Sequence, residues 1–316
     1  MSRAESLPVD VGVRRPPAPE PPGPLVEPSS KDVVLAYVAL TKPRIIELLL
    51  VTTVPAMVLA AGGWPSTLLV LYTLIGGTLA AGGANAINCY VDRDIDQVME
   101  RTRKRPLPMH KVPARNALLF GILLGVTAFT FLAVSVNTIS AILATCALLF
   151  YVFVYTLGMK RSTPQNIVIG GAAGAVPVLV GWSAVTGTLD LPALAMFSIV
   201  FYWTPPHFWA LAMKYSDDYA AAEVPMMPVV YGIKETTRHI LLYSFLLFAM
   251  CLALFSVARL GFVYLGAAVV LNGIFIALAV KLYHDPDTKR AWGLFRFSIL
   301  YLALLFAAIA VDVLVS

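Results

Sequence analysis

A row of oxygen-bearing side chains marks the stretch from residue 85 to residue 96. Asn88, Asp92 and Asp96 recur every four residues, and on a helix such residues share one face, about 6 Å apart along the axis. Hard divalent cations such as Mg²⁺ take one or two carboxylates together with waters and substrate phosphates. We therefore predict a metal site here. The alternative is a solvated helix end whose carboxylates pair with Arg93 or Arg101.

A second acidic pair, Asp217 and Asp218, follows another apolar segment four segments further along the chain. An isolated Asp-Asp pair is more often a solvated turn than a site. Two acidic segment ends in corresponding positions nevertheless indicate a weak internal repeat, and this repeat favours a functional role for both clusters.

Basic residues accompany these acids. Arg101 to Arg105 follow the first cluster, and Lys160 and Arg161 follow the fourth apolar segment. Membrane topology alone explains any single one of them. The functional interpretation is a diphosphate clamp, in which metal ions bridge the diphosphate to the carboxylates and Arg and Lys neutralise the remaining charge. No P-loop or GxGxxG motif is present, so we expect neither a nucleotide nor a nucleic-acid partner.

A diphosphate bound at a membrane implies a lipid tail. Ionising an allylic C–O bond requires a metal ion and cations to stabilise the departing diphosphate, and a water-poor cavity to protect the carbocation. Prenyl transfer is therefore the chemistry that these residues suit.

The elements that position these residues are membrane-spanning helices. Of the 316 residues, 59% are hydrophobic and 13% are charged, about half the charge of a soluble domain. The apolar runs are continuous and near 20 residues long, the length that a spanning helix needs. We predict an all-α polytopic membrane protein with nine transmembrane helices in one bundle, at residues 45–62, 66–90, 116–134, 138–158, 165–184, 191–212, 239–258, 262–282 and 293–314.

The distribution of charge predicts the orientation. All but two of the 23 lysines and arginines, Arg259 and Arg296, fall on the N-terminal side of the membrane, which is the cytoplasmic side by the positive-inside rule. Residues 1–33 are rich in proline and are predicted to form a disordered arm, with residues 34–316 as the transmembrane domain. The arm has no apolar stretch and carries several acids, so a secretory or organellar signal is not expected. We expect the protein to lie in a bacterial cytoplasmic (inner) membrane.

Three runs of the sequence carry a resemblance to a known family. The spacing of Asn88, Asp92 and Asp96, followed by Arg101 and Arg105-Pro-Leu, resembles the first signature of the UbiA-type intramembrane prenyltransferases. The runs 155–171 and 203–219 resemble, within that superfamily, the protoheme IX farnesyltransferase (heme O synthase) family. The resemblance covers about residues 35–316.

The resemblance implies a nine-helix bundle with its catalytic loops in the cytoplasm. It implies that farnesyl diphosphate, a vinyl group of heme b and water give heme O and diphosphate, with Mg²⁺ as cofactor. Heme b is a substrate, the lipid bilayer is the surrounding medium, and a downstream heme A synthase is a candidate partner, because heme O serves terminal oxidases directly or after conversion to heme A.

The resemblance also implies roles for individual residues. Asn88, Asp92 and Asp96 would bind one side of the metal–diphosphate complex and Asp217 and Asp218 the other, all five as catalytic metal ligands. The diphosphate oxygens would bind the basic residues Arg101, Arg105, Lys160 and Arg161. Quinone-forming relatives usually carry a second DxxxD, whereas Ala222 stands four residues after Asp218. The ligands of the second metal therefore stay open, and Asp218 alternatively only orients Asp217.

His207 lies near the inner end of the sixth predicted span. Our hypothesis is that it contacts heme, as an axial ligand or as a partner of a propionate. The alternative is a histidine hydrogen-bonded within its helix.

Three other functions remain as alternatives. The first is a prenyltransferase whose acceptor is an aromatic quinone precursor. The second is a cation-coupled transporter, whose acids would lie near mid-membrane on interrupted helices, unlike those found here. The third is a non-catalytic assembly factor for oxidases, which would have little need for two acidic clusters.

The three cysteines, Cys89, Cys146 and Cys251, are isolated in sequence and predict neither a disulfide nor a zinc site.

Overall fold

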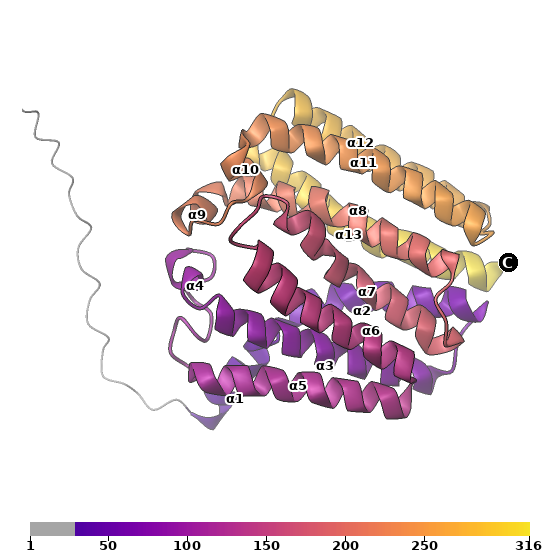
Figure 1. The fold of residues 1–316 in the computed structure, drawn as a ribbon. Coiled ribbons are helices and arrows are strands. Elements are labelled where there is room, and N and C mark those ends of the chain that lie inside the picture. The colour runs from indigo at the N-terminus through magenta and orange to yellow at the C-terminus, as the bar shows by residue number, and fades with distance from the viewer. Residues whose placement is uncertain (1–28) are drawn as a thin grey trace, which may run out of the picture.

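The protein is a bundle of long helices that run side by side (Figure 1). The computed structural model describes residues 29–316, apart from the side chains at positions 45 and 47–50, and in this range it contains helices and no strand. The long helices are α2 (Pro43–Ala61), α3 (Thr67–Val91), α5 (Ala114–Ser135), α6 (Thr138–Leu149) continued by the π-helix η1 (Phe150–Met159), α7 (Asn166–Thr186), α8 (Leu191–Lys214), α11 (Gly232–Val257), α12 (Phe262–His284) and α13 (Thr288–Val315).

The predicted all-α fold is confirmed, and each predicted span coincides with one of these helices, although α11 and α13 begin several residues earlier. Seven of the described helices are long and apolar enough to cross a membrane: α3, α5, α6 with η1, α7, α11, α12 and α13. Two long helices are not among them. In α8 the polar run from Thr204 to His207 lowers the hydropathy, and of α2 only Val51–Ala61 counts as a short apolar helix. The number of nine spans therefore stays a prediction.

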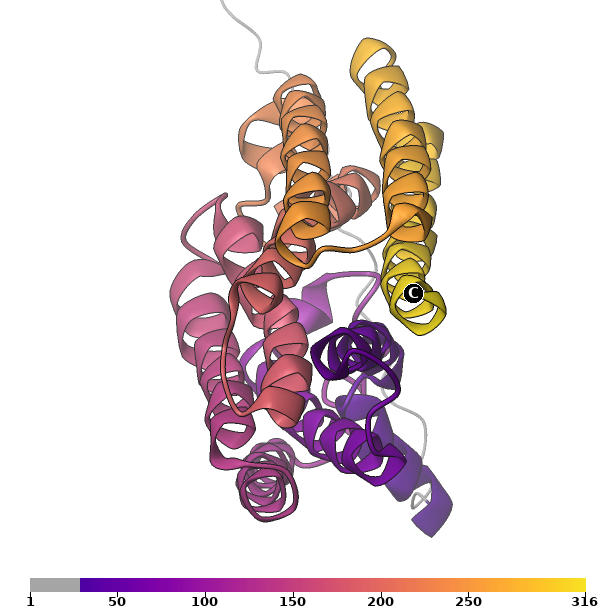
Figure 2. The same ribbon diagram turned by 90° about the vertical axis from the view of Figure 1, so that its right-hand side faces the viewer.

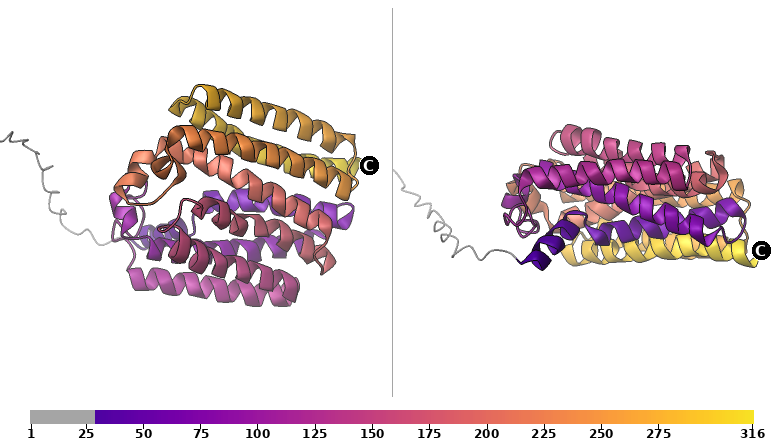
Figure 3. Two further views of the ribbon diagram at one scale, coloured as in Figure 1. Left: turned by 45° about the horizontal axis from the view of Figure 1, so that its top comes forward. Right: turned by 90° about the horizontal axis from the view of Figure 1, so that it is seen from below.

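Short helices gather at one end of the bundle. The helices α4 (Ile95–Val98), α9 (Ser216–Ala221) and α10 (Met227–Val230) lie there together with α1 (Ser30–Leu40), and the C-terminus lies at the opposite end (Figures 1 and 3). The sequence did not predict these four helices. Because α1 begins at Ser30, the last residues of the predicted arm are helical; residues 1–28 lie outside the described residues, and disorder there stays a prediction.

Glycines allow two of the long helices to approach closely. A Cβ atom added at Gly83 of α3 would lie 2.8 Å from the carbonyl oxygen of Gly121 in α5, a distance that real side chains do not adopt. Small residues at helix interfaces are the usual way in which membrane helices pack. This contact fixes α3, the helix that carries Asn88, against its neighbour.

The largest core cluster of the described residues joins α8, α11, α12 and α13 and also includes residues of α2 and α7. Figure 2 shows α11, α12 and α13, drawn in orange and yellow, grouped at one edge of the bundle. Trp209, Phe275, Tyr301 and Phe306 are fully buried in this cluster. The hydroxyl of Tyr301 donates to Asn272 Oδ1 over 3.1 Å, which pairs these two polar side chains within the core, whereas the buried Nε1 of Trp209 has no partner among the described residues.

A carboxylate joins the C-terminal end of α13 to the start of α12. Asp312 of α13 is only 2% exposed, and its oxygens accept the backbone N–H groups of Gly261 at 2.5 Å and Tyr264 at 3.0 Å. These amides belong to the first turn of α12, where N–H groups have no acceptor within the helix and where a negative charge is favoured. Asp312 therefore caps α12 from a neighbouring helix.

We predict that Asp312→Ala lowers the free energy of unfolding by about 2 kcal/mol, because two buried N–H groups lose a charged acceptor. Asp312→Asn keeps one acceptor oxygen and should lose less. Thermal unfolding in detergent measures both, with Ser256→Ala as the control, since this exposed serine bonds only within its own helix. Unfolding of Asp312→Ala at the wild-type temperature would contradict the capping role.

Candidate active site

The predicted row of oxygen ligands crosses a helix end. Asn88 lies in α3, Asp92 is its C-terminal cap, and Asp96 lies in α4, so the prediction that one helix carries all three is wrong. The chain nevertheless keeps a helical turn at each step: the N–H of Asp92 donates to the carbonyl of Asn88, and that of Asp96 to the carbonyl of Asp92, both at 2.9 Å. The three side chains are buried, with 3%, 0% and 2% of their surface exposed.

Each buried acid has a cationic partner from another part of the chain. Lys160 Nζ lies 2.5 Å from Asp92 Oδ2, and Arg105 Nη1 donates to both oxygens of Asp96 at 2.9 and 2.8 Å. The alternative pairing with Arg93 or Arg101 is therefore not observed. Asn88 joins the network, because its Nδ2 donates to Asp92 Oδ2 over 2.7 Å.

Lys42 is a member of this network that sequence reasoning missed. Its Nζ donates to Asn88 Oδ1 over 2.7 Å, and burial lowers its pKa to about 8. Its backbone adopts the left-handed region, with φ of 54°, which is uncommon outside glycine and is enriched at functional sites. The available signal was the position of Lys42 directly before Pro43 at the start of an apolar helix.

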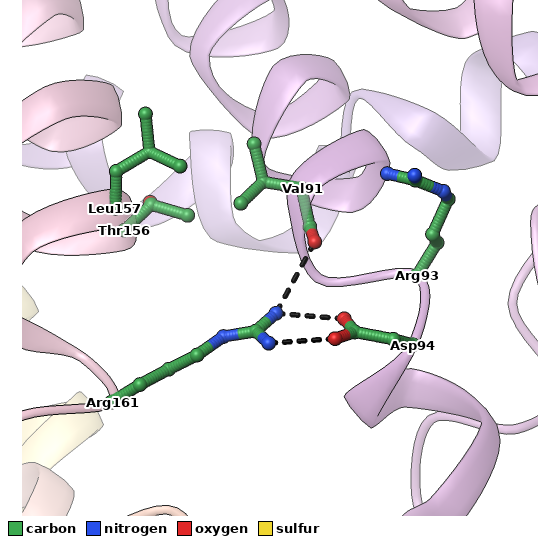
Figure 4. A pocket seen from close by; sticks show the side chains of 6 residues that line it. All are labelled: Val91, Arg93, Asp94, Thr156, Leu157 and Arg161. Carbon is green, nitrogen blue, oxygen red and sulfur yellow. Dashed lines mark hydrogen bonds and ion pairs between the residues drawn. The ribbon is translucent and has the colours of Figure 1, made fainter.

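A third ion pair lines a pocket beside this network. Both Nη atoms of Arg161 donate to the carboxylate of Asp94, at 2.6 and 2.7 Å, and this partner holds the pKa of Asp94 at about 2. Figure 4 shows the pair at the edge of a pocket of about 360 Å³ lined by Val91, Arg93, Asp94, Thr156, Leu157 and Arg161. Asp94 was not among the predicted site residues.

The second acidic cluster lies at the same end of the bundle, since α9 and α4 are neighbours there (Figure 1). Asp218 accepts the backbone N–H groups of Glu100 at 3.3 Å and Arg101 at 3.2 Å. Asp217 is exposed, and among the residues that the structure describes no hydrogen bond or ion pair of its side chain is found. Arg101 Nη2 donates to the hydroxyl of Tyr219 over 3.4 Å. The structure therefore joins the two clusters through the loop after α4.

His207 lies in α8 between two aromatic rings. The rings of Trp203 and Phe295 stack on either side, with centroids at 4.3 and 4.6 Å, and Nδ1 lies 2.6 Å from the Oγ of Ser298. The Ser298 hydroxyl donates to the carbonyl of Phe295, so its oxygen accepts a hydrogen bond from the N–H at Nδ1. This assignment leaves Nε2 with a free lone pair, which is the state that can bind a metal.

Comparison with known proteins decides the family. The profile of the UbiA prenyltransferase family matches residues 49–307. The chain belongs to the UbiA prenyltransferase family. A protein of Frankia alni named protoheme IX farnesyltransferase is 56% identical over 285 residues, which cover 89% of this chain and 99% of that protein.

Two solved structures share the UbiA fold with this chain. A digeranylgeranylglyceryl phosphate synthase has a TM-score of 0.75 at 18% identity, covering 90% of this chain and 100% of that one. A UbiA homologue from Archaeoglobus fulgidus, bound to DMAPP and Mg²⁺, has a TM-score of 0.62 at 18% identity, covering 87% and 99%. Together with the seven apolar helices, they identify the chain as a membrane protein with the UbiA fold.

The donor atoms of this candidate site fit a hard cation. Asp92 Oδ1 is buried without a hydrogen-bond partner, and Arg161 Nη2 lies 3.7 Å from it. Across residues 29–316 no three His, Cys, Asp or Glu side chains are grouped so as to hold a metal by themselves. Carboxylate and amide oxygens at Asn88, Asp92 and Asp96 match Mg²⁺, which usually keeps waters and substrate phosphates among its ligands.

Asn166 is a further residue that sequence reasoning did not assign to the site. It is fully buried at the start of α7, its Nδ2 donates to the carbonyl of Lys160 over 3.4 Å, and its Oδ1 has no partner. An unpaired buried acceptor costs about 1–3 kcal/mol. The described network thus leaves two acceptors unsatisfied, Asp92 Oδ1 and Asn166 Oδ1, and both residues contact Lys160 through another atom.

We predict that Arg105→Met lowers the free energy of unfolding by about 3 kcal/mol, because it leaves the buried carboxylate of Asp96 without a cation. The double variant Asp96→Asn with Arg105→Met removes that charge and should recover part of the loss. Thermal unfolding of the substrate-free protein measures both. Arg103→Met is the matched control, since its pair with Glu100 is exposed and contributes little. A double variant less stable than Arg105→Met would refute this account of the pair.

Proposed function

We propose that this chain is a protoheme IX farnesyltransferase. It transfers the farnesyl group of farnesyl diphosphate to a vinyl group of heme b, with addition of water, to give heme O and diphosphate. The observation that carries the proposal is the group of buried carboxylates and cations at one end of a UbiA-family bundle. The acceptor follows from the relatives of more than 50% identity that bear this name over nearly their whole length.

The acids bind Mg²⁺ and the cations bind the diphosphate. Asn88, Asp92 and Asp96 hold one side of the metal–diphosphate complex, and the acidic pair of α9, Asp217 and Asp218, lies on the other, where at least one of its two carboxylates binds the metal. The support is the unsatisfied Asp92 Oδ1 and the Mg²⁺ in the Archaeoglobus fulgidus homologue. When bound, Mg²⁺ stabilises the negative charge of the departing diphosphate.

The diphosphate oxygens are bound by the basic residues of the same end, Arg101, Arg105, Lys160 and Arg161. Three of these four pair with an acid in the substrate-free protein. A bound anion offers them oxygens in place of those carboxylates, and charge-assisted hydrogen bonds of this kind are strong. These residues therefore neutralise the leaving group while the C–O bond breaks.

Aromatic side chains line the apolar side of the same region. Tyr155, Phe208 and Tyr215 pack against a buried cluster that includes Ile95 and Tyr219. Such faces stabilise a cation and keep water away from it. The allylic cation forms a C–C bond to the terminal vinyl carbon, the cation that results beside the porphyrin ring takes up water, and a proton is released.

The expected orientation in the membrane agrees with the proposed function. We place the chain in a bacterial cytoplasmic membrane, with its N-terminus and the site end in the cytoplasm and a heme A synthase as a candidate partner. The support is the excess of basic residues in the loops of the site end. The acids lie at helix ends rather than on interrupted helices near mid-membrane, which speaks against a transporter.

The reaction itself is the first test. Purified protein in nanodiscs with heme b, farnesyl diphosphate and Mg²⁺ should yield a heme heavier by one farnesyl group and one water, as measured by mass spectrometry. Asp92→Asn should reduce the rate at least about 100-fold, because it removes a charge that positions the metal–diphosphate complex. EDTA should abolish the product.

The control substrate is 4-hydroxybenzoate. Its prenylation without any change to heme would keep the chemistry and overturn the acceptor, and the absence of product from both acceptors would overturn the proposed function. Arg103→Met, which alters an exposed pair, should retain the wild-type rate.

We also propose that His207 contacts heme b through Nε2. We predict that His207→Ala changes the Soret absorption of the heme-loaded protein and weakens heme binding about tenfold or more, because one axial bond is lost. His239→Ala is the matched control, since this histidine pairs with Glu235 at the start of α11. An unchanged heme spectrum in His207→Ala would remove the residue from the site.

A further inference from the structure

Asp218 differs from the other acids of the site in the partners of its carboxylate. Asp92 and Asp96 face Lys160 and Arg105, whereas Asp218 faces backbone amides. Its Oδ1 accepts the N–H of Glu100 at 3.3 Å, and its Oδ2 accepts that of Arg101 at 3.2 Å. Both oxygens are therefore engaged by one peptide segment, 117 and 118 residues away in sequence.

The two amides have no other acceptor in the described structure. After α4 the loop turns back on itself: the N–H groups of Thr102 and Arg103 donate to the carbonyl of Met99. Those of Glu100 and Arg101 appear in no backbone hydrogen bond of residues 29–316. Both residues are exposed. Asp218 is therefore the acceptor that the described residues offer to these two amides, with water as the alternative.

Further contacts join the same two segments. Arg101 Nη2 donates to the hydroxyl of Tyr219 over 3.4 Å, and its guanidinium lies 5.6 Å from the ring of Tyr215. Met99 packs in the apolar cluster that contains Tyr219 and Val224. The loop thus packs on α9 by an apolar contact, and the two hydrogen bonds to the carboxylate of Asp218 fix its orientation there.

The loop carries two of the cations that the site needs. Arg101 follows Glu100 directly, and Arg105 reaches Asp96 from the other end of the same turn. Thr102 between them is buried, and its hydroxyl donates to the carbonyl of Asp96 over 3.1 Å. The position of the Glu100–Arg101 peptide therefore determines the backbone positions from which the side chains of Arg101 and Arg105 extend.

We propose that Asp218 is a positioning residue, which holds the loop of residues 99–105 against α9, and that Asp217 is the acid of this pair that binds the metal. The use of the loop in diphosphate binding rests on the proposed function; the contact itself does not. Asp217 is exposed and engaged by no described residue, so its oxygens are free for a cation, whereas those of Asp218 are occupied.

Amide hydrogen exchange of the substrate-free, metal-free protein tests the contact. In Asp218→Ala the amides of Glu100 and Arg101 should exchange about tenfold faster, because each loses a hydrogen bond to a charged acceptor. Asp218→Asn retains one acceptor oxygen and should give a smaller increase. Asp217→Ala is the matched control, a neighbouring carboxylate without contact to the loop, and exchange at residues 99–105 should not change.

The dependence of the reaction on Mg²⁺ separates the two acids. Asp218→Asn should raise the KM for farnesyl diphosphate and leave the Mg²⁺ concentration at half-maximal rate within about twofold of wild type. Asp217→Asn should raise that Mg²⁺ concentration about tenfold or more, since a metal ligand is lost. Equal shifts in both variants would overturn the division of roles.

Exchange data remain decisive if either variant is unstable or the protein shows no farnesyl transfer. Unchanged exchange at Glu100 and Arg101 in both Asp218 variants would overturn the proposal, whatever the reaction proves to be. Faster exchange in a protein without heme farnesylation would support the loop contact and reject the proposed function. The two failures are thereby distinguished.

Discussion

The pairing of buried carboxylates with cations at one end of the bundle determines the arrangement of the site. Asp92 and Asp96 are almost completely buried, and a buried charge without a partner destabilises a protein by about 3–5 kcal/mol. Each acid is therefore bound to a cation from a separate loop, Lys160 after η1 and Arg105 after α4. These pairs fix where two loops lie, because a loop placed elsewhere would leave a carboxylate unpaired.

The same pairs prepare the site for an anion. A cation that neutralises a carboxylate is already positioned, and it can exchange that partner for a phosphate oxygen without leaving its place. The described network also retains acceptors without donors, Asp92 Oδ1 and Asn166 Oδ1. An empty network with unsatisfied acceptors gains more from a bound cation than a fully satisfied one would. In the proposed reaction, binding of metal and diphosphate together would replace one set of ion pairs by another.

The long helices could be predicted from the sequence, because hydropathy is a local property. The acids of the candidate site could be selected as candidates, because charges near hydrocarbon are rare. Sequence reasoning placed Asn88, Asp92 and Asp96 on one helix, and it missed the break at Asp92, since four-residue spacing continues through a capped turn. It assigned no role to Lys42 or Asp94. Their partners lie 46 and 67 residues away, and such contacts follow from how the helices pack, which spacing along the chain does not specify.

Burial of an acid alone does not mark it as functional in this fold. Asp312 is as buried as Asp96, and the cost of a charge in the membrane would select both as functional. Their partners separate them: Asp96 faces an arginine side chain, whereas Asp312 faces the backbone amides that begin α12. A side-chain cation can turn to a new anion, but backbone amides stay where the fold holds them. By this criterion Asp218, which also binds backbone amides, resembles Asp312 more than Asp96, and its carboxylate is better suited to fixing a loop than to exchanging partners during catalysis.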